Sequence, residues 1–113
     1  MLWLSLWRMT SDDWRKRVAA VNDLANSTDS RAVDALVKAL ADAKREVRWT
    51  SAFALASQGD SRSVPVLKEC YDAKPDANIT QHAVTMLAQF AKYGNNEASD
   101  ALKESAARDP NHS

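Results

Sequence analysis

The stretch DSRAVDAL at residues 29–36 recurs at residues 60–67 as DSRSVPVL, an offset of 31 residues. The segments that precede the two copies align at the same offset, RVAAVNDLA at 17–25 with RWTSAFALA at 48–56. A third and looser copy covers residues 79–102. Self-similarity at a fixed period of about 20–50 residues is typical of repeat architectures, so the sequence predicts one structural unit that occurs three times.

Each unit is predicted to contain two helices. Only two glycines and three prolines occur among many Ala, Leu, Lys and Glu residues, and no alternating strand pattern is present, which favours helix. Asp29 and Asp60 stand where N-cap residues are needed, and Gly59 and Gly94 stand where a helix must end and the chain reverse. The predicted first helices cover residues 12–26, 44–58 and 77–92, and the predicted second helices cover residues 30–41, 61–72 and 96–107.

A single unit is too small to bury its apolar face, so stacking of three units is expected to make the fold stable. The predicted repeat domain covers residues 11–108, with units at about 11–42, 43–74 and 75–108. Residues 1–10 are expected to be an apolar N-terminal extension or capping segment, and residues 109–113 a tail. The predicted core consists of Val21, Leu24, Val33, Leu36, Leu40, Val47, Ala52, Leu55, Val64, Leu67, Ile79, Ala83, Leu87 and Leu102.

The repeated positions resemble the bacterial HEAT-like repeat, the type also found in phycobilin lyases. The positions that carry the resemblance are Val47-Arg48, Ser51-Ala52, Ala54-Leu55, Gly59-Asp60, Arg62, Val64-Pro65 and Leu67. It covers about residues 12–107, and the third unit departs from it with Thr80 in place of arginine and Asn95 in place of aspartate. The resemblance implies an all-α fold of three helical hairpins stacked as a short right-handed α-solenoid, a HEAT/armadillo-like superhelix.

Composition restricts the classes of partner. Fifteen basic residues balance fifteen acidic ones, which argues against binding driven by phosphate neutralisation. The apolar start at residues 1–9 is too short to span a bilayer and lacks the features of a signal peptide. We therefore expect no membrane association and a cytoplasmic location. The single cysteine, Cys70, lies in an apolar helical pattern and is predicted to be a buried, inert thiol.

No enzymatic site is predicted. The GDS triplet at residues 59–61 resembles the nucleophile block of GDSL-type hydrolases, but DSR at 60–62 is duplicated at 29–31, and one active site would not recur with every repeat. His82 and His112 lie away from Ser61 in the sequence. A nucleophile needs an adjacent base, so Ser61 is interpreted as the start of a helix. The sequence also predicts no metal site and no cofactor, because it contains no Cys/His cluster.

Arg17 and Arg48 occupy equivalent positions of the first two units. The resemblance implies that they pair with the turn aspartates Asp29 and Asp60, which together would form a structural repeat ladder. A basic ladder that binds an anion is the alternative.

Trp49 and Phe53 lie one helical turn apart and share a face. The equivalent residues are Val18 and Asn22 in the first unit, and Gln81 and Thr85 in the third. These positions are therefore expected to face solvent, where an apolar pair needs a cover. The cover is expected to be the Trp3 and Trp7 segment of the same chain, a second copy in a homodimer through Trp3, Trp7, Trp49 and Phe53, or another protein. The alternative is that Trp49 and Phe53 are two scattered surface aromatics that partly cover their own helix.

The resemblance implies that the second helices form the concave side. Alignment of the units places three rows there: Asp34, Pro65 and Asp100; Val37, Lys68 and Lys103; and Lys38, Glu69 and Glu104. A peptide or protein surface is expected to dock on these rows, so the candidate partner-binding residues are Asp34, Lys38, Lys68, Glu69 and Lys103, with Trp49 and Phe53 on the convex side.

The sequence therefore predicts a non-enzymatic protein–protein interaction scaffold or adaptor. One alternative, from the resemblance alone, is a helper for tetrapyrrole attachment. The other is a nucleic-acid-binding module, because the HEAT-like folds that this chain resembles include DNA glycosylases that cradle a duplex, and five basic residues are expected along one edge. Those residues are Arg15, Lys16, Lys44, Arg45 and Lys74. Acidic residues on the same edge make a solvated mixed-charge surface the preferred interpretation.

Overall fold

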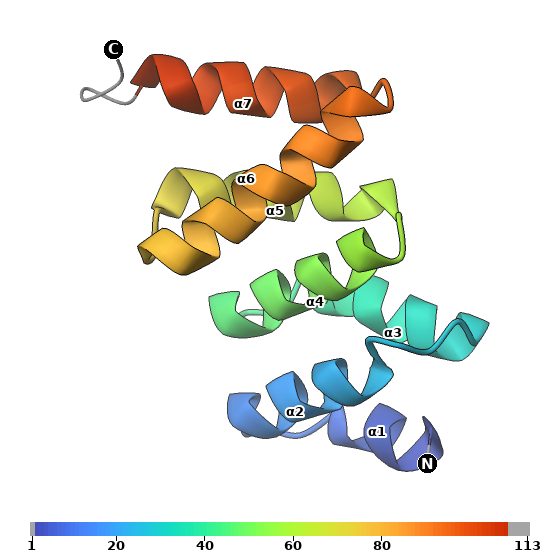
Figure 1. Ribbon diagram of the computed structural model, residues 1–113. Coiled ribbons are helices and arrows are strands. Elements are labelled where there is room, and N and C mark those ends of the chain that lie inside the picture. The colour runs from blue at the N-terminus through green and yellow to red at the C-terminus, as the bar shows by residue number, and fades with distance from the viewer. Residues whose placement is uncertain (1, 109–113) are drawn as a thin grey trace. The chain divides into compact units, whose positions relative to one another are not determined.

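The computed structural model describes residues 2–108, with side chains described for residues 2–104; the predicted tail at 109–113 lies outside the described residues. Within this range the chain forms helices and no strand (Figure 1). The elements are α1 (Leu2–Arg8), α2 (Trp14–Leu24), α3 (Ser30–Ala39), α4 (Arg45–Ser57), the 3-10 turn η1 (Ser61–Ser63), α5 (Val64–Ala73), α6 (Ala77–Lys92) and α7 (Asn96–Arg108). The prediction of an all-α fold is confirmed, and the predicted helix limits agree to within a few residues.

Local chemistry explains where the helices begin and end. Asp29 accepts a hydrogen bond from the Arg31 N–H at 2.9 Å, and Asp76 accepts one from the Ile79 N–H at 2.9 Å. These bonds satisfy backbone donors that have no partner within the first turn. Gly59 and Gly94 adopt φ values of 76° and 94°, and both end a helix. The backbone N–H of the residue after each glycine donates to a carbonyl of the last helical turn, Asp60 to Leu55 and Asn95 to Phe90. This is the Schellman arrangement.

The helices form two compact units: unit 1 comprises α1–α4 and η1, and unit 2 comprises α5–α7. The boundary lies between residues 63 and 64, at the junction of η1 and α5. It therefore falls inside the segment 43–74 that the sequence suggests as one repeat.

The core of unit 1 lies between α2, α3 and α4. α2 and α3 both pack against α4, and their fully buried side chains include Val21, Leu24, Leu36 and Leu55. α1 also belongs to this unit, because it packs against α2 and α3 and places Leu2, Leu6 and Met9 against the same core.

In unit 2, α6 packs against both α5 and α7, and α5 also contacts α7. The buried side chains are Val64, Leu67, Cys70, Ala83, Leu87, Ala98 and Ala101. The burial predicted for the Cys70 thiol is confirmed.

Most of the predicted core is buried. The exceptions are Val33, Leu40, Ile79 and Leu102, which are half-buried. In α7 the buried residues are Ala98 and Ala101, so Leu102 lies beside the buried face of the helix and not on it. Among the described residues no helix combines the length and the apolar character that crossing a bilayer requires.

Candidate functional site on α1 and α3

The 31-residue register extends upstream into α1. Ser5 is buried, as are its equivalents Leu36 and Leu67, and Leu6 is half-buried like its equivalent Val37. α1 packs against α2, the following helix, just as α3 packs against α4 and α5 against α6. α1 therefore corresponds to the second helix of a repeat rather than to an unrelated extension. The sequence signal for this lies in the spacing of the apolar residues Leu2, Leu6 and Met9, which matches Val33, Val37 and Leu40 at the same offset.

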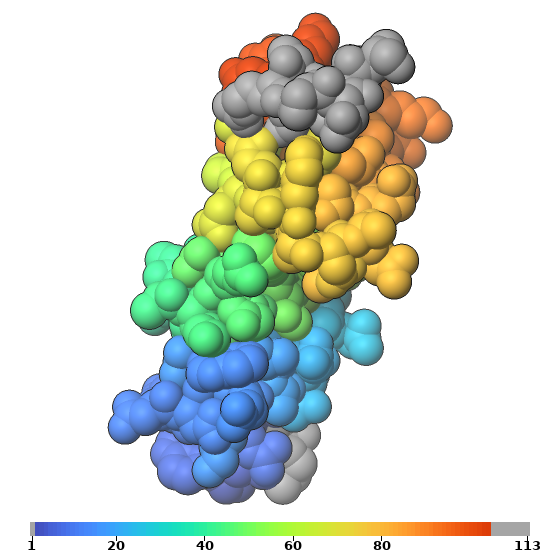
Figure 2. Space-filling view, turned by 90° about the vertical axis from the view of Figure 1, so that its left-hand side faces the viewer, coloured from blue at the N-terminus to red at the C-terminus, as the bar shows by residue number. Residues whose placement is uncertain are grey.

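The two exposed tryptophans of α1 occupy equivalent positions to residues of the predicted docking rows. Trp3 aligns with Asp34, and Trp7 aligns with Lys38. Trp3 and Trp7 are 67% and 68% exposed, while Leu2 and Leu6 of the same helix pack on the core. In the space-filling view the violet-blue surface of α1 is visible below the brighter blue of α2 (Figure 2). Two large apolar side chains one turn apart thus face solvent.

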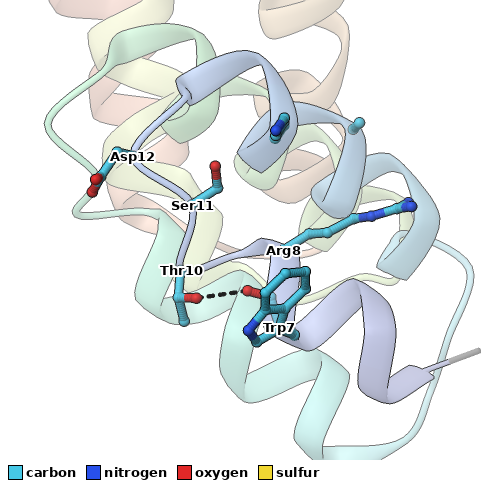
Figure 3. A pocket seen from close by; sticks show the side chains of 7 residues that line it. Trp7, Arg8, Thr10, Ser11 and Asp12 are labelled. Atoms are coloured by element: carbon cyan, nitrogen blue, oxygen red, sulfur yellow. Dashed lines mark hydrogen bonds between the residues drawn. The ribbon is translucent and has the colours of Figure 1, made fainter.

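A hollow of about 610 Å³ lies beside Trp7 and is called the Trp7 hollow below. Its lining residues are Trp7, Arg8, Thr10, Ser11, Asp12, Lys16 and Ala19 (Figure 3). The Thr10 hydroxyl donates a hydrogen bond of 2.7 Å to the Trp7 carbonyl oxygen. This bond stabilises the turn after α1, from which Thr10, Ser11 and Asp12 follow along one side of the hollow (Figure 3).

A second hollow, of about 470 Å³, separates the end of α1 from α3 and is called the α1–α3 groove below. Leu6, Met9, Ala35 and Ala39 give it apolar walls, and Thr10, Arg31, Asp34, Lys38 and Asp42 complete its lining. It contains two of the predicted partner-binding residues, Asp34 and Lys38, and both are exposed. Thr10 lines both hollows, so the two are neighbours.

Several charges around these hollows are paired with neighbouring residues. Arg31 pairs with Asp29 at 3.2 Å, and Arg8 lies 3.8 Å from Asp23. The Arg31 guanidinium, which hydrogen-bonds the Asp29 carboxylate, holds the pKa of that carboxyl below its ordinary value. Lys16 and Lys38 differ, because neither forms an ion pair within the part of the chain whose side chains are described.

Arg17 pairs with Asp42, and the predicted pairing of Arg17 and Arg48 with Asp29 and Asp60 is wrong. Arg17 Nε and Nη2 donate to the two Asp42 oxygens at 2.8 and 3.0 Å, and Nη1 donates to the Ser11 carbonyl at 2.7 Å. Arg48 Nη1 donates to the carbonyls of Asp42 and Ala43.

The physical reason is the antiparallel packing of α2 and α3. The start of the first helix meets the turn that follows the second helix, where Asp42 lies. Asp29 and Asp60 lie at the other end, between the helices, where Arg31 and Arg62 bind them. The carboxylate of Asp42 also accepts the Lys44 N–H at 2.9 Å, so it joins the end of α3 to the start of α4.

Acid is expected to destabilise unit 1 through Asp42. Burial raises the pKa of Asp42, but the hydrogen bonds from the Arg17 guanidinium and the Lys44 N–H lower it by more, so it lies below its ordinary value. A carboxyl whose pKa is lower in the folded protein than in the unfolded chain, where it is about 3.9, stabilises the fold at pH values above 3.9. This stabilisation is lost as the pH falls through the pKa of the folded state. Urea unfolding between about pH 6 and pH 2 should therefore show a shallower loss of stability in Asp42→Asn than in the wild type. Identical slopes would contradict this role.

The structure corrects the interpretation of Trp49. Its side chain is only 6% exposed, and the Arg45 guanidinium lies 5.0 Å from the centre of its ring. Phe53 is half-buried, whereas Gln81 and Thr85, the equivalents in α6, are exposed. The expectation of a solvent-facing position is wrong for Trp49, because equivalent positions in a repeat share a backbone location but not the same neighbours. The exposed tryptophans of unit 1 are those of α1.

The remaining candidate residues lie in unit 2. The Lys68 ammonium bridges Asp72 at 3.2 Å and Glu104 at 3.3 Å, and hydrogen bonds to Asp72 first and Glu104 second raise its pKa. Lys68 is thus already engaged, while Glu69 is half-buried and Lys103 is exposed. The described residues contain no group of three or more side chains suited to holding a metal ion.

These helical hairpins, with their shared 31-residue register, define a helical repeat protein. The sequence matches the family model of HEAT repeats over residues 4–88, and the chain belongs to this family. The match begins inside α1, in agreement with the equivalence of α1 to a repeat helix. No curated protein matches the chain significantly. The predicted HEAT-like family is confirmed, whereas the finer likeness to the repeats of phycobilin lyases stays a prediction.

Proposed function

We propose that this protein is a non-enzymatic scaffold or adaptor that binds another protein through the exposed surface of α1 and α3 in unit 1. HEAT repeats are commonly protein-interaction scaffolds, which supports the general class. The observation that carries the proposal is the surface of α1 and α3 in unit 1, where exposed Trp7 and Lys38 lie beside hollows with partly apolar linings. Tryptophan is enriched among the residues that dominate protein–protein affinity.

A protein partner fits this molecule better than a nucleic acid. Four of the five basic residues predicted along one edge lie over aromatic rings of the same chain, including Lys74, whose ammonium lies 4.5 Å from the centre of the Tyr71 ring. Arg15 and Lys44 lie 5.4 and 4.8 Å from the centre of the Trp14 ring, and Arg45 stacks on Trp49. Side chains held this way cover apolar surface with their stems, and they leave a weak basic track for a phosphate backbone.

Catalysis at Ser61 lacks support from its neighbours. The Asp60 carboxylate accepts bonds from the backbone N–H and the guanidinium of Arg62, so it is engaged as a cap. Ser61 itself begins η1, as its interpretation as a helix start predicts. A nucleophile requires a base that is oriented toward it, and the Asp60 carboxylate is occupied elsewhere.

The proposal predicts that binding depends on Lys38. Affinity purification with mass spectrometry on the full chain should lose its specific partner, by at least about tenfold in recovery, in Lys38→Glu. Lys92→Glu is the matched control, because Lys92 is an exposed lysine at the end of α6 in unit 2. It should recover the same partner as the wild type. Equal recovery with all three proteins would remove α3 as the binding face.

A further inference from the structure

We propose that the protein forms a two-fold dimer through unit 1, in which α2 packs antiparallel to α2 of a second copy and Trp7 contacts that copy. The surface involved is called the α1–α2 face below, and its residues are Leu4, Trp7, Arg8, Lys16, Ala19 and Asp23. This inference goes beyond the proposed function, since Lys38 and the α1–α3 groove do not belong to the α1–α2 face.

Two hollows lie along the α1–α2 face. The Trp7 hollow includes Lys16 and Ala19 of α2 in its lining. A further hollow, of about 430 Å³, lies between Leu4 and Arg8 of α1 and Asp23 near the end of α2. Arg8 lines both hollows. The two therefore adjoin, and the hollowed surface continues along the length of α2.

The repeat register shows that this surface has the backbone arrangement on which helices stack. The residues 31 positions after Arg8, Lys16 and Asp23 are Ala39, Val47 and Ala54. These three equivalents are buried in the core of unit 1, where α1 packs against α3 and α2 packs against α4. Arg8, Lys16 and Asp23 themselves are exposed. The hairpin of α1 and α2 thus presents a stacking face that no described part of the chain covers.

The charges of this surface are complementary to a second copy of themselves. Two basic residues, Arg8 and Lys16, and two acidic residues, Asp12 and Asp23, line the two hollows, so their charges balance. A balanced surface does not repel its own copy, whereas it offers no excess charge to a strongly acidic or basic partner.

The spacing of the charges on α2 favours an antiparallel two-fold arrangement. Lys16 and Asp23 are seven residues apart, which is about two helical turns, and therefore lie on one side of α2. A two-fold axis beside Ala19 places Lys16 of each copy next to Asp23 of the other. The exposed side chain of Ala19 is small, so the two helices can approach closely at the axis. Asp23 is 53% exposed and only 3.8 Å from Arg8 at its nearest, so its carboxylate can accept a second cation.

Trp7 supplies apolar area at the edge of the α1–α2 face. Its side chain is 68% exposed and lines the same hollow as Lys16 and Ala19. Tryptophan is enriched among the residues that dominate protein–protein affinity. The face is formed by helices of only 7 and 11 residues. Because this places the interface at the low end of the usual size range, we expect a weak dimer with a micromolar dissociation constant.

Sedimentation velocity of the full chain over a concentration series tests the inference. The wild type should change from monomer to dimer as its concentration rises. Lys16→Glu and Asp23→Lys each bring like charges together across the axis, so each should weaken the dimer about tenfold or more. An equimolar mixture of these two variants should dimerise about as well as the wild type, because every carboxylate then faces an ammonium. Trp7→Ala should weaken the dimer without loss of helical circular dichroism.

Lys38→Glu is the matched control, because it makes the same substitution at an exposed lysine of unit 1 outside the α1–α2 face. It should dimerise like the wild type. A chain that stays monomeric at every concentration would overturn the inference and identify the face as a solvated cap. A mixture of Lys16→Glu and Asp23→Lys that dimerises no better than either variant alone, or equal weakening by Lys38→Glu, would overturn it as well. Loss of the captured partner in Lys38→Glu concerns the proposed function alone, so the two proposals can fail separately.

Discussion

Leu55→Ala is expected to lower the free energy of unfolding of unit 1 by about 2–5 kcal/mol. Leu55 lies in α4, is fully buried and belongs to the core cluster that joins α2, α3 and α4. Removing three of its carbon atoms loses their transfer free energy and leaves a cavity that packed helices fill only in part. Leu36→Ala, on the facing helix α3, is expected to have a similar cost, because Leu36 is also fully buried in this cluster.

Urea denaturation followed by tryptophan fluorescence measures this effect. All four tryptophans (Trp3, Trp7, Trp14 and Trp49) lie in unit 1, so the signal reports the unfolding of that unit. Leu4→Ala is the matched control, since Leu4 is a half-buried leucine of α1. Its cost is expected to stay below about 1.5 kcal/mol. A Leu55→Ala protein as stable as the Leu4→Ala protein would show that the assigned core register is wrong.

The second large effect is expected at the ion pair between Arg17 and Asp42. Their side chains are 17% and 12% exposed, and two hydrogen bonds join them. Asp42→Ala removes both hydrogen bonds to Arg17, whose guanidinium keeps its bond to the Ser11 carbonyl. It also removes the side-chain oxygen that accepts the Lys44 N–H. Breaking a buried pair costs about 3–5 kcal/mol, so for this partly exposed pair we expect a loss of about 2–3 kcal/mol.

The same denaturation assay separates this pair from an ordinary surface pair. Asp23→Ala removes the carboxylate that lies 3.8 Å from the Arg8 guanidinium. The side chains of Arg8 and Asp23 are 45% and 53% exposed. Exposed pairs of this kind contribute about 0–1 kcal/mol. If Asp42→Ala and Asp23→Ala cost the same small amount, Asp42 does not join the end of α3 to the start of α4 as the geometry indicates.

The sequence by itself was sufficient to predict the helices and the family. Asp29, Asp76, Gly59 and Gly94 mark helix ends through bonds and backbone angles that involve only nearby residues. The aspartate cap recurs at Asp29 and Asp60, 31 residues apart, so this offset identified helix starts as well as the HEAT repeats. The fully buried leucines, such as Leu36 and Leu55, followed from helical periodicity for the same reason.

Tertiary structure decided which side chains meet. Arg17 reaches Asp42, 25 residues away, because α2 and α3 run antiparallel and bring the start of one helix to the turn after the other. Trp49 is buried although an equivalent residue in α6 is exposed, and α1 proves to be equivalent to a repeat helix that leaves Trp3 and Trp7 exposed. Periodicity specifies the face of a helix on which a residue lies. Only packing determines what covers that face, because the covering atoms come from segments distant in the sequence.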